Sequence, residues 1–316
     1  MKVETSRKKR LEAKRPVNRK LLLAVFVITG LASGFFWWRG KVIHETVIPA
    51  EGVAVKIETE PTRKVNKKQD KLVADIESLV ATASGRYAVS VYHLGDNSGY
   101  GINQNERMPA ASLMKLPVMT AVSQMIAGGQ LELDDTYTLE GADRATGSGP
   151  LQFKTAGSVY TIDELLSYLG KNSDNTAWVM FNRRLGKKTM ESELERLGMK
   201  DSSYDELVTT AADTVRMFEY IYKQEGELFE YLTDSIYEDR IPVGLAGVEG
   251  VRVIHKVGTD VGVWADAGIV SCQLTVENCR LRPFILAILN ENVKREEAQT
   301  IVPQIAKLVW EYEKTL

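Results

Sequence analysis

The sequence predicts a domain of mixed α/β (α+β) class, in which an antiparallel sheet is flanked by helices and carries an inserted all-helical subdomain, preceded by one transmembrane helix. Strand-like alternation appears near both ends of the region 71–316, at residues 87–92 and again after residue 251. Between them, residues 111–245 are mostly helical in pattern. Residues 21–38 are apolar and uncharged over a length that spans a bilayer.

The first 20 residues form a basic tail. They contain nine Lys/Arg and two Glu, a net charge of +7, and because the whole chain carries −2, the remainder carries −9. An acidic body has no broad cationic face, so we expect no nucleic-acid partner. Basic residues ahead of an apolar span stay on the cytoplasmic side. We therefore expect a cytoplasmic N-terminus and an extracytoplasmic domain at the cell membrane.

Residues 21–38 read LLLAVFVITGLASGFFWW. As a helix, this stretch reaches about 27 Å, close to the hydrocarbon thickness of a bilayer. Trp37, Trp38 and Arg39 close it, as interface residues do. The alternative is a signal peptide cleaved near the Ala-Ser-Gly run at 32–34. Aromatic bulk follows that run and the basic region is unusually long for a signal peptide, so we favour the anchor.

The elements of the domain follow in order along the chain. Residues 39–70 are polar and mixed in charge, with two prolines, and are expected to form a linker. The domain then begins at residue 71 with a helix, because apolar residues recur on one helical face. Residues 87–92 alternate as a strand, and the Gly- and Asn-containing turn at 95–99 leads into a second strand from Tyr100.

After the helical insertion, the pattern returns to strands at 251–257, 264–272 and 282–289. A last helix follows, and Pro303 inside it predicts a kink or a late start. We expect the cleft between the sheet and the insertion to hold the functional site.

Ser112 and Lys115 form the first pair with chemical meaning. At helical spacing the two share a face, so the amine can reach the hydroxyl. A serine at a helix start also lies where backbone N–H groups favour developing negative charge. The spacing alone is a weak signal, because Ser6 and Lys9 in the basic tail share it.

Two further elements follow along the chain. Ser173 opens the run Ser-Asp-Asn between two helical patterns, where a serine is more often a helix cap or a loop residue. Lys256 opens the run Lys-Val-Gly-Thr at the end of an apolar strand, where a lysine could point into a cleft or lie on an exposed edge.

Together these elements resemble the motif set of penicillin-recognising serine enzymes, Ser-x-x-Lys, Ser-Asp-Asn and Lys-Thr/Ser-Gly, in that family's order. The resemblance runs from about residue 72 to 312 and is closest to class A β-lactamases. Similar stretches also occur at 173–177, 241–245, 255–259 and 266–269.

The resemblance implies a role for each catalytic residue. Ser112 would attack a carbonyl and become acylated, and Lys115 would accept its proton. Lys115 must then be neutral, and burial beside Lys256 would lower its pKa. Ser173 would pass a proton to the leaving nitrogen.

The resemblance also implies a substrate-binding set, Asn175, Gly258 and Thr259. Asn175 would bind the substrate's side-chain amide, and Lys256 with the Thr259 hydroxyl would bind a substrate carboxylate. The backbone N–H groups of Ser112 and Thr259 would form the oxyanion hole.

The chain departs from the family in two ways. Val257 stands where the family has Thr or Ser, which removes one hydroxyl from the carboxylate site. The Glu-x-x-Leu-Asn pattern, whose Glu activates the deacylating water, is absent from a much shortened segment after Leu197. Asp205 or Glu206 could substitute as deacylation base, but both are more simply surface acids of a turn.

Cys272 and Cys279 flank a six-residue connection between two predicted strands. Such a hairpin can bring the two Cα atoms within the roughly 4.4–6.8 Å that a disulfide requires. Two buried free thiols are the alternative. The histidines His44, His93 and His255 lack metal-ligand spacing, so we expect no metal and no cofactor; His255 should face away from Lys256 on the same strand.

The sequence leaves three functions open. The first is a membrane-anchored serine hydrolase, expected to be a monomer, that forms a Ser112 acyl-enzyme with β-lactams or peptidoglycan peptides and deacylates slowly. The second is a sensor of β-lactams or of the cell wall that is acylated but not turned over. The third is a degenerate binding domain, against which the intact set of Ser112, Lys115, Ser173 and Lys256 argues.

Overall fold

The computed structural model of the protein describes residues 66–224, 226–272 and 281–316. The predicted basic tail, the predicted transmembrane helix at 21–38 and most of the predicted linker lie outside the described residues. Within the described ranges, no helix combines the length and the apolar character needed to span a bilayer.

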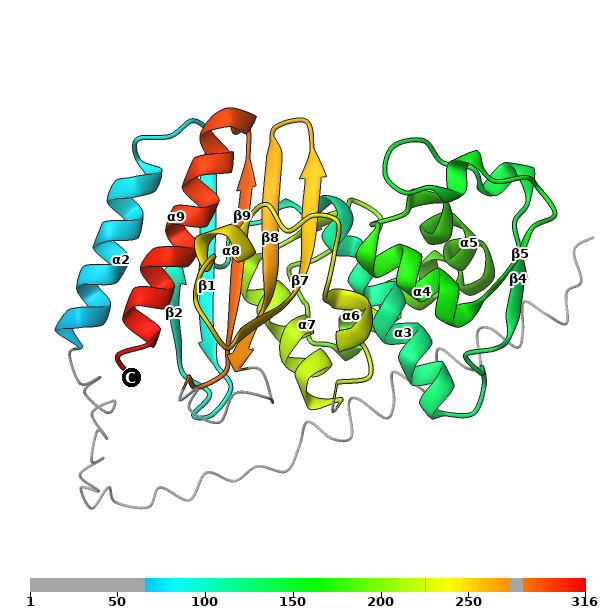
Figure 1. Cartoon of the computed structure of the whole chain (residues 1–316), viewed down its shortest axis with the longest axis horizontal. Helices are drawn as coiled ribbons and strands as arrows, with labels where there is room; N and C mark the ends of the chain where they lie inside the picture. The colour runs from blue at the N-terminus through cyan, green and yellow to red at the C-terminus, as the bar shows by residue number, and fades with distance from the viewer. Residues whose placement is uncertain (1–65, 225, 273–280) are drawn as a thin grey trace, which may run out of the picture. The chain divides into compact units, whose positions relative to one another are not determined.

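A five-stranded antiparallel sheet organises the fold (Figure 1). Its strands lie in the spatial order β2-β1-β9-β8-β7. Their bounds are β1 (Arg86–His93), β2 (Gly99–Ile102), β7 (Val251–Asp260), β8 (Val263–Cys272) and β9 (Phe284–Glu291). The predicted N-terminal hairpin and the three predicted C-terminal strands are therefore confirmed. β7 is an edge strand, and it is the strand nearest to the inserted helices (Figure 1).

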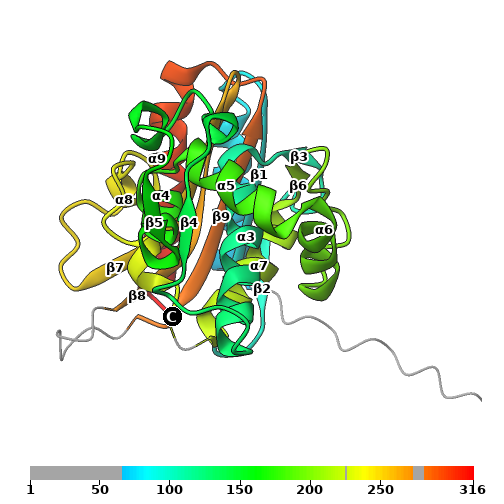
Figure 2. The ribbon, with the colours of Figure 1, turned by 90° about the vertical axis from the view of Figure 1, so that its right-hand side faces the viewer.

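The two faces of the sheet are buried by different helices, because successive strand residues point to opposite faces. Val89 of β1 and Ile288 of β9 pack in one apolar cluster with α2 (Lys67–Val80) and α9 (Arg295–Glu313). Ala88 and Ala287, their neighbours along the strands, pack in a second cluster with α7 (Ala211–Lys223). Figure 2 shows α9 and α7 on opposite sides of the strands. Each fully buried large apolar side chain stabilises this arrangement by about 1.5–3 kcal/mol.

The first helix begins earlier than predicted. Asn66 caps it, since its side chain accepts the backbone N–H of Gln69, and α2 starts at Lys67. The Asn66 amide also donates to the hydroxyl of Tyr312 on α9 at 2.7 Å. The prediction that the linker extends to residue 70 is therefore wrong, because capping and tertiary contact outweigh the polar composition of this stretch.

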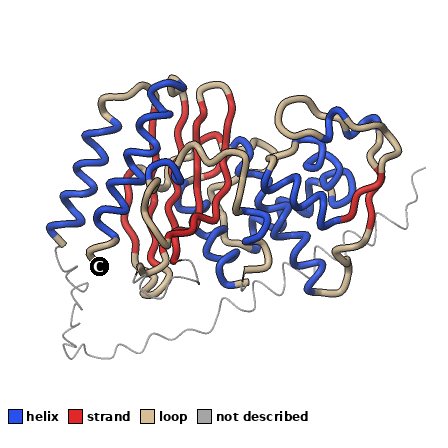
Figure 3. Tube along the Cα trace, in the orientation of Figure 1, coloured by secondary structure: helices blue, strands red, loops and turns tan. Residues whose placement is uncertain are grey.

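The described part of the predicted insertion, 111–245, contains five longer helices: α3 (Leu116–Ala127), α4 (Ile162–Lys171), α5 (Asn175–Leu185), α6 (Lys187–Arg196) and α7, of which α7 packs on the sheet. The prediction of an all-helical insertion is wrong, because two short antiparallel pairs lie within it or at its start. These are β3 (Met108–Pro109) with β6 (Val208–Thr209), and β4 (Thr136–Thr138) with β5 (Val159–Thr161). Figure 3 shows the β4–β5 pair as a strand segment separated from the sheet. Strands of two or three residues are too short to show alternation in a sequence.

The chain returns from the insertion to the sheet through short elements, η4 (Phe229–Leu232) and α8 (Ile241–Gly244). α8 packs closely on α9, since a Cβ at Gly244 would lie 2.4 Å from the carbonyl oxygen of Pro303. Pro303 lies well inside α9, which begins at Arg295. The predicted late start of the last helix is therefore wrong.

Candidate active site

Ser112 lies in a 3-10 turn, η1 (Ala111–Lys115), that leads directly into α3. The regular helix thus begins at Leu116, four residues after the serine, and not at the serine as predicted. Ala111, immediately before Ser112, has a φ of 46°, in the left-handed region that alanine rarely adopts. Such conformations persist where the surrounding structure imposes them, and they cluster at functional sites.

Lys115 points into the interior beside Ser112. Its side chain is 1% exposed, and its Nζ lies 3.1 Å from Ser112 Oγ. The same amine donates to Asn175 Oδ1 at 2.7 Å and lies 3.2 Å from Ser173 Oγ. Burial lowers the pKa of Lys115 to about 7, against the opposing charge of Asp174. A neutral form of this lysine is therefore available near neutral pH to accept the serine proton.

Ser173 joins the two amines of the site. Its hydroxyl oxygen accepts a hydrogen bond from Lys256 Nζ at 2.7 Å and also lies 3.2 Å from Lys115 Nζ. Ser173 lies between α4 and α5 with a φ of 51°, a second strained backbone position in the site. The capping role is taken by Asp174, whose carboxylate accepts the backbone N–H groups of Ala177 and Leu151. The serine is therefore free to face the lysines.

Lys256 extends inward from the edge strand β7 and is 2% exposed. Burial lowers its pKa strongly, and the positive charges of Lys115 and Arg240 lower it further. The predicted effect of one lysine on the other thus falls on Lys256, whereas burial accounts for the lowered pKa of Lys115. The predicted contact of Lys256 with a substrate carboxylate stays a prediction.

Gly258 allows the edge strand to approach the nucleophile. A Cβ at this position would lie 2.7 Å from the carbonyl oxygen of Ala110, just before the turn that carries Ser112. Only a residue without a side chain permits this contact. It brings the strand backbone at Thr259 near the turn, which is the arrangement that the predicted oxyanion hole needs.

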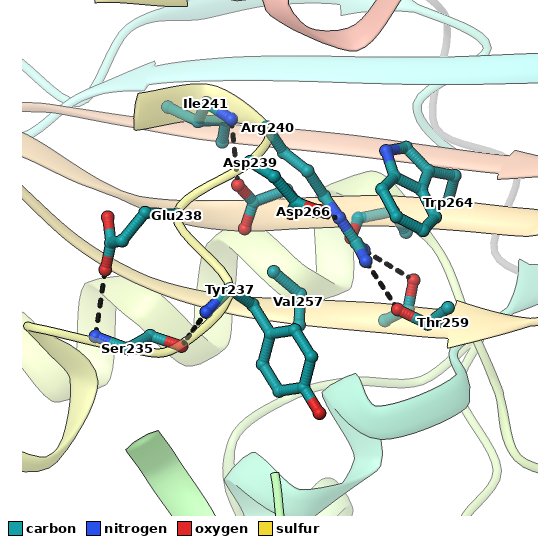
Figure 4. Close-up of polar contacts among 12 residues, drawn as sticks. Ser235, Tyr237, Glu238, Asp239, Arg240, Ile241, Val257, Thr259, Trp264 and Asp266 are labelled. Atoms are coloured by element: carbon teal, nitrogen blue, oxygen red, sulfur yellow. Dashed lines mark hydrogen bonds and ion pairs between the residues drawn. The ribbon is translucent and has the colours of Figure 1, made fainter. Parts of the chain in front are cut away.

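Arg240 is part of the site and was not predicted. Its guanidinium is fully buried, donates to the carbonyl oxygens of Gly258 (2.9 Å) and Ala265, and donates to the Thr259 hydroxyl. It also stacks 3.8 Å from the ring centre of Trp264. Figure 4 shows it between Trp264 and Thr259. In the sequence, Arg240 is marked only by its position directly before the 241–245 run, and that position does not indicate a function.

Arg240 changes the chemistry of the carboxylate site. Val257 lacks the hydroxyl that the family has at this position, but Thr259 lies two residues further along the strand, so both side chains point to the same face. The buried guanidinium donates to the Thr259 hydroxyl oxygen, which leaves the hydroxyl hydrogen free to donate and places a positive charge behind it. The predicted contact of Thr259 with a substrate carboxylate stays a prediction.

Asn175 is held at both ends of its amide. Its Oδ1 accepts from Lys115, and its Nδ2 donates to the carbonyl oxygen of Thr146 at 2.8 Å. It therefore links the catalytic lysine to the loop at 145–150, and its predicted contact with a substrate amide stays a prediction.

Asp205 and Glu206 lie on the surface. Their side chains are 67% and 62% exposed, and they pair with Lys187 and with Arg107 (2.6 Å), respectively. A general base must lie within hydrogen-bond reach of the water that it activates. The positions of these two carboxylates support the alternative of surface turn acids.

An aromatic pair lies beside Lys115. The ring centre of Trp178, on α5, lies 5.8 Å from Lys115 Nζ. Its indole N–H donates to the Tyr204 hydroxyl at 2.6 Å, and that hydroxyl donates to Asn182 Oδ1 at 2.7 Å. Tyr204 belongs to the shortened segment after α6 and is buried. The segment thus presents an aromatic ring toward α5, which sequence reasoning missed because it followed acids only.

Two remaining predictions concern β7 and β8. His255 contacts Asp266 at 2.9 Å, whereas its neighbour Lys256 contacts Ser173, so the prediction that the two face opposite sides is confirmed. Cys272, at the end of β8, is not a free thiol. Its predicted partner Cys279 lies outside the described residues, and the pairing stays a prediction.

Comparison with known proteins identifies the family of this chain. The model of the β-lactamase enzyme family matches residues 71–312. Beta-lactamase VEB-1 from Pseudomonas aeruginosa is 27% identical over 279 residues, which cover 78% of this chain and 92% of that protein.

Solved structures share the fold. A β-lactamase from Sphaerobacter thermophilus superimposes with a TM-score of 0.70 at 22% identity, over 78% of this chain and 98% of that one. PBP-A superimposes with a TM-score of 0.69 at 20% identity, over 81% and 99% of the two chains. Because the family model spans the domain that carries all three motifs, the chain belongs to the β-lactamase enzyme family and is a class A β-lactamase-like serine hydrolase.

Proposed function

We propose that the protein forms a Ser112 acyl-enzyme with β-lactams or with peptidoglycan peptides, and that it hydrolyses this ester slowly. The observation that carries the proposal is the hydrogen-bonded set Ser112–Lys115–Ser173–Lys256, combined with an aromatic pair beside Lys115.

Acylation follows from the geometry of the amines. Neutral Lys115 takes the proton of Ser112 as its oxygen attacks the carbonyl carbon. Ser173, which contacts both amines, gives its proton to the leaving nitrogen and takes a proton from protonated Lys115, so that the amine is neutral again; Lys256 stabilises negative charge on the Ser173 oxygen during this transfer. The Thr259 hydroxyl, which accepts a hydrogen bond from Arg240, donates its own hydrogen to the substrate carboxylate, and the buried Arg240 charge strengthens that contact from behind.

Slow deacylation is proposed because hydrolysis of the ester needs a base beside the attacking water. Asp205 and Glu206 pair with surface cations, so neither carboxylate lies where it could activate that water. The side chain that lies beside Lys115 is the aromatic ring of Trp178, which cannot act as a base. Loss of a positioned base lowers a rate by about 10²–10⁴. A variant of the structural neighbour PBP-A was solved as an acyl-enzyme complex with penicillin G, which supports a β-lactam as the probe.

Intact-mass spectrometry tests the proposal. The full chain, purified in detergent and mixed with penicillin G, should gain one penicillin mass within seconds and keep it for minutes or longer. Rapid consumption of penicillin without an accumulated adduct would show that deacylation is fast. An adduct that is never released would favour the second candidate, a sensor that is acylated and not turned over.

We further propose a single-pass protein of the cell membrane, with a cytoplasmic N-terminus, an extracytoplasmic catalytic domain and a monomeric state. The +7 tail ahead of the uncharged span at 21–38 supports this topology. Protease added to spheroplasts should degrade the catalytic domain while a label on the first residues survives. Protection of the domain would contradict the topology, and a soluble product that begins near residue 35 would contradict the anchor.

A further inference from the structure

Residues 235–241, here called the bridging segment, connect the inserted helices to the sheet. At one end, the Ile236 N–H and the Ser235 hydroxyl both donate to the carbonyl oxygen of Lys171, at the end of α4. At the other end, the Ile241 N–H donates to Asp266 Oδ2 on β8 at 3.0 Å (Figure 4). Arg240 lies next to this second anchor, so the position of the segment sets the position of the guanidinium.

His255 lies behind the bridging segment, on the face of β7 away from Lys256. Its side chain is fully buried, with Nδ1 2.9 Å from Asp266 Oδ1 and Nε2 3.4 Å from Glu238 Oε1. Both ring nitrogens therefore face carboxylates, one from the sheet and one from the bridging segment. Burial alone would lower the pKa of His255, but the two carboxylates outweigh it and raise the pKa to about 9. The ring is a cation at neutral pH.

The His255 imidazolium balances the negative charges of Asp266 and Glu238 near Arg240. Asp266 is fully buried and uses one oxygen for His255 and the other for the Ile241 N–H. Glu238 accepts the Ser235 N–H at 2.8 Å as well as facing His255. Without the imidazolium, the buried Asp266 carboxylate would lose its nearest counter-ion, which supports the hydrogen bond from the Ile241 N–H. The bridging segment would also lose the contact between Glu238 and His255.

We infer that His255 is a positioning residue for the substrate-carboxylate site: together with Asp266 and Glu238, it holds the bridging segment so that Arg240 presents its guanidinium beside Thr259. The inference rests on the proposed acylation of Ser112 by substrates that carry a carboxylate. It assigns His255 no contact with substrate, and its effect is transmitted through Arg240.

A selectivity ratio tests the inference. The second-order rate constant of acylation is measured for penicillin G and for its methyl ester, with the full chain in detergent, and the ratio reports recognition of the carboxylate. Arg240→Gln should lower the ratio about 10-fold or more, because it removes the positive charge that supports the Thr259 hydroxyl. His255→Gln should lower it by at least about 5-fold. In the double variant the ratio should fall no further than in Arg240→Gln alone, because coupled residues are not additive.

Matched controls separate this effect from general destabilisation. His93→Gln removes the other histidine that contacts a buried carboxylate, at the C-terminal end of α9, and should leave the ratio unchanged. Glu238→Gln weakens the contact between residue 238 and His255 by changing the more exposed of the two residues, and it should lower the ratio as His255→Gln does. It keeps the test decisive if His255→Gln does not fold.

The outcomes distinguish the inference from the proposed function. A reduced ratio in Arg240→Gln with an unchanged ratio in His255→Gln and Glu238→Gln would overturn the positioning role and leave the proposed function intact. Additive losses in the double variant would also overturn it, since His255 would then act independently of Arg240. Absence of acylation in the unaltered protein would overturn the proposed function itself.

Discussion

Among single residues, Ser112 and Lys115 make the most direct prediction. Ser112→Ala should abolish labelling by a fluorescent penicillin, because Ser112 is the only serine beyond residue 40 with a lysine three residues on, and its Oγ lies 3.1 Å from that amine. Lys115→Ala should slow labelling by about 10²–10⁴, the usual effect of losing a positioned base. Ser6→Ala, at the same Ser-x-x-Lys spacing in the basic tail, is the control and should label normally. Undiminished labelling of Ser112→Ala would remove the central assignment.

Acylation should depend on pH through Lys115. The amine must be neutral to accept the serine proton, and its pKa is lowered to about 7, so the acylation rate should rise with pH and reach half its maximum near pH 7. Trp178→Ala should move this midpoint upward, because water admitted beside the amine removes part of the burial that lowers its pKa. Stopped-flow acylation between pH 5 and 9 measures both midpoints. A rate independent of pH over this range would contradict the role of Lys115.

At the scale of elements, the proposal of slow deacylation concerns the shortened segment between α6 and β6. Asp205→Asn and Glu206→Gln should each leave the decay of the penicilloyl adduct within about 2-fold of the unaltered protein, since both carboxylates pair with surface cations. Timed intact-mass spectra give the decay rate. A drop of 100-fold in either variant would identify that residue as the base after all.

The C-terminal helix is fastened to the N-terminal hairpin by a buried carboxylate. Glu313 on α9 accepts the Tyr100 hydroxyl at 2.7 Å and contacts His93 Nε2 at 2.9 Å. Glu313→Gln should lower the free energy of unfolding by roughly 1–3 kcal/mol, because it weakens two hydrogen bonds to a charged group. Urea denaturation at pH 6 measures this loss.

The same contact gives the stability a pH dependence with a defined sign. The hydrogen bond to Glu313 raises the pKa of His93 above 6.5. The stabilisation is therefore fully present below pH 6.5 and is lost as pH rises through the raised pKa. The difference between the unaltered protein and Glu313→Gln should shrink between pH 6 and pH 9. A constant difference would show that the imidazolium contributes nothing.

At the scale of the whole molecule, the sequence predicted those parts that local pattern determines. The three motifs carry their residue types in a fixed order, so Ser112, Lys115, Ser173 and Lys256 could be grouped before any contact was known, and the structure brings their side chains together. The strands of the sheet were predicted because they are long enough to alternate.

What the sequence did not predict depends on contacts between distant segments. Arg240 and His255 acquire their roles only when the bridging segment packs on β7 and β8. The pair β4–β5 is too short to alternate, and Asn66 caps α2 with support from a side chain 246 residues away. No window of sequence contains these partners together.

The crowding of two amines around the Ser173 hydroxyl has a thermodynamic consequence. Burial and the neighbouring cations lower the pKa of Lys256, so this amine loses its proton more readily than an exposed lysine. A carboxylate that docks against this amine favours the charged form and so draws a proton from solvent. Ligand capture and proton uptake are then one linked equilibrium, and affinity for an anionic ligand must decline as the solution becomes more alkaline. Binding of an anionic ligand at this site therefore depends on pH.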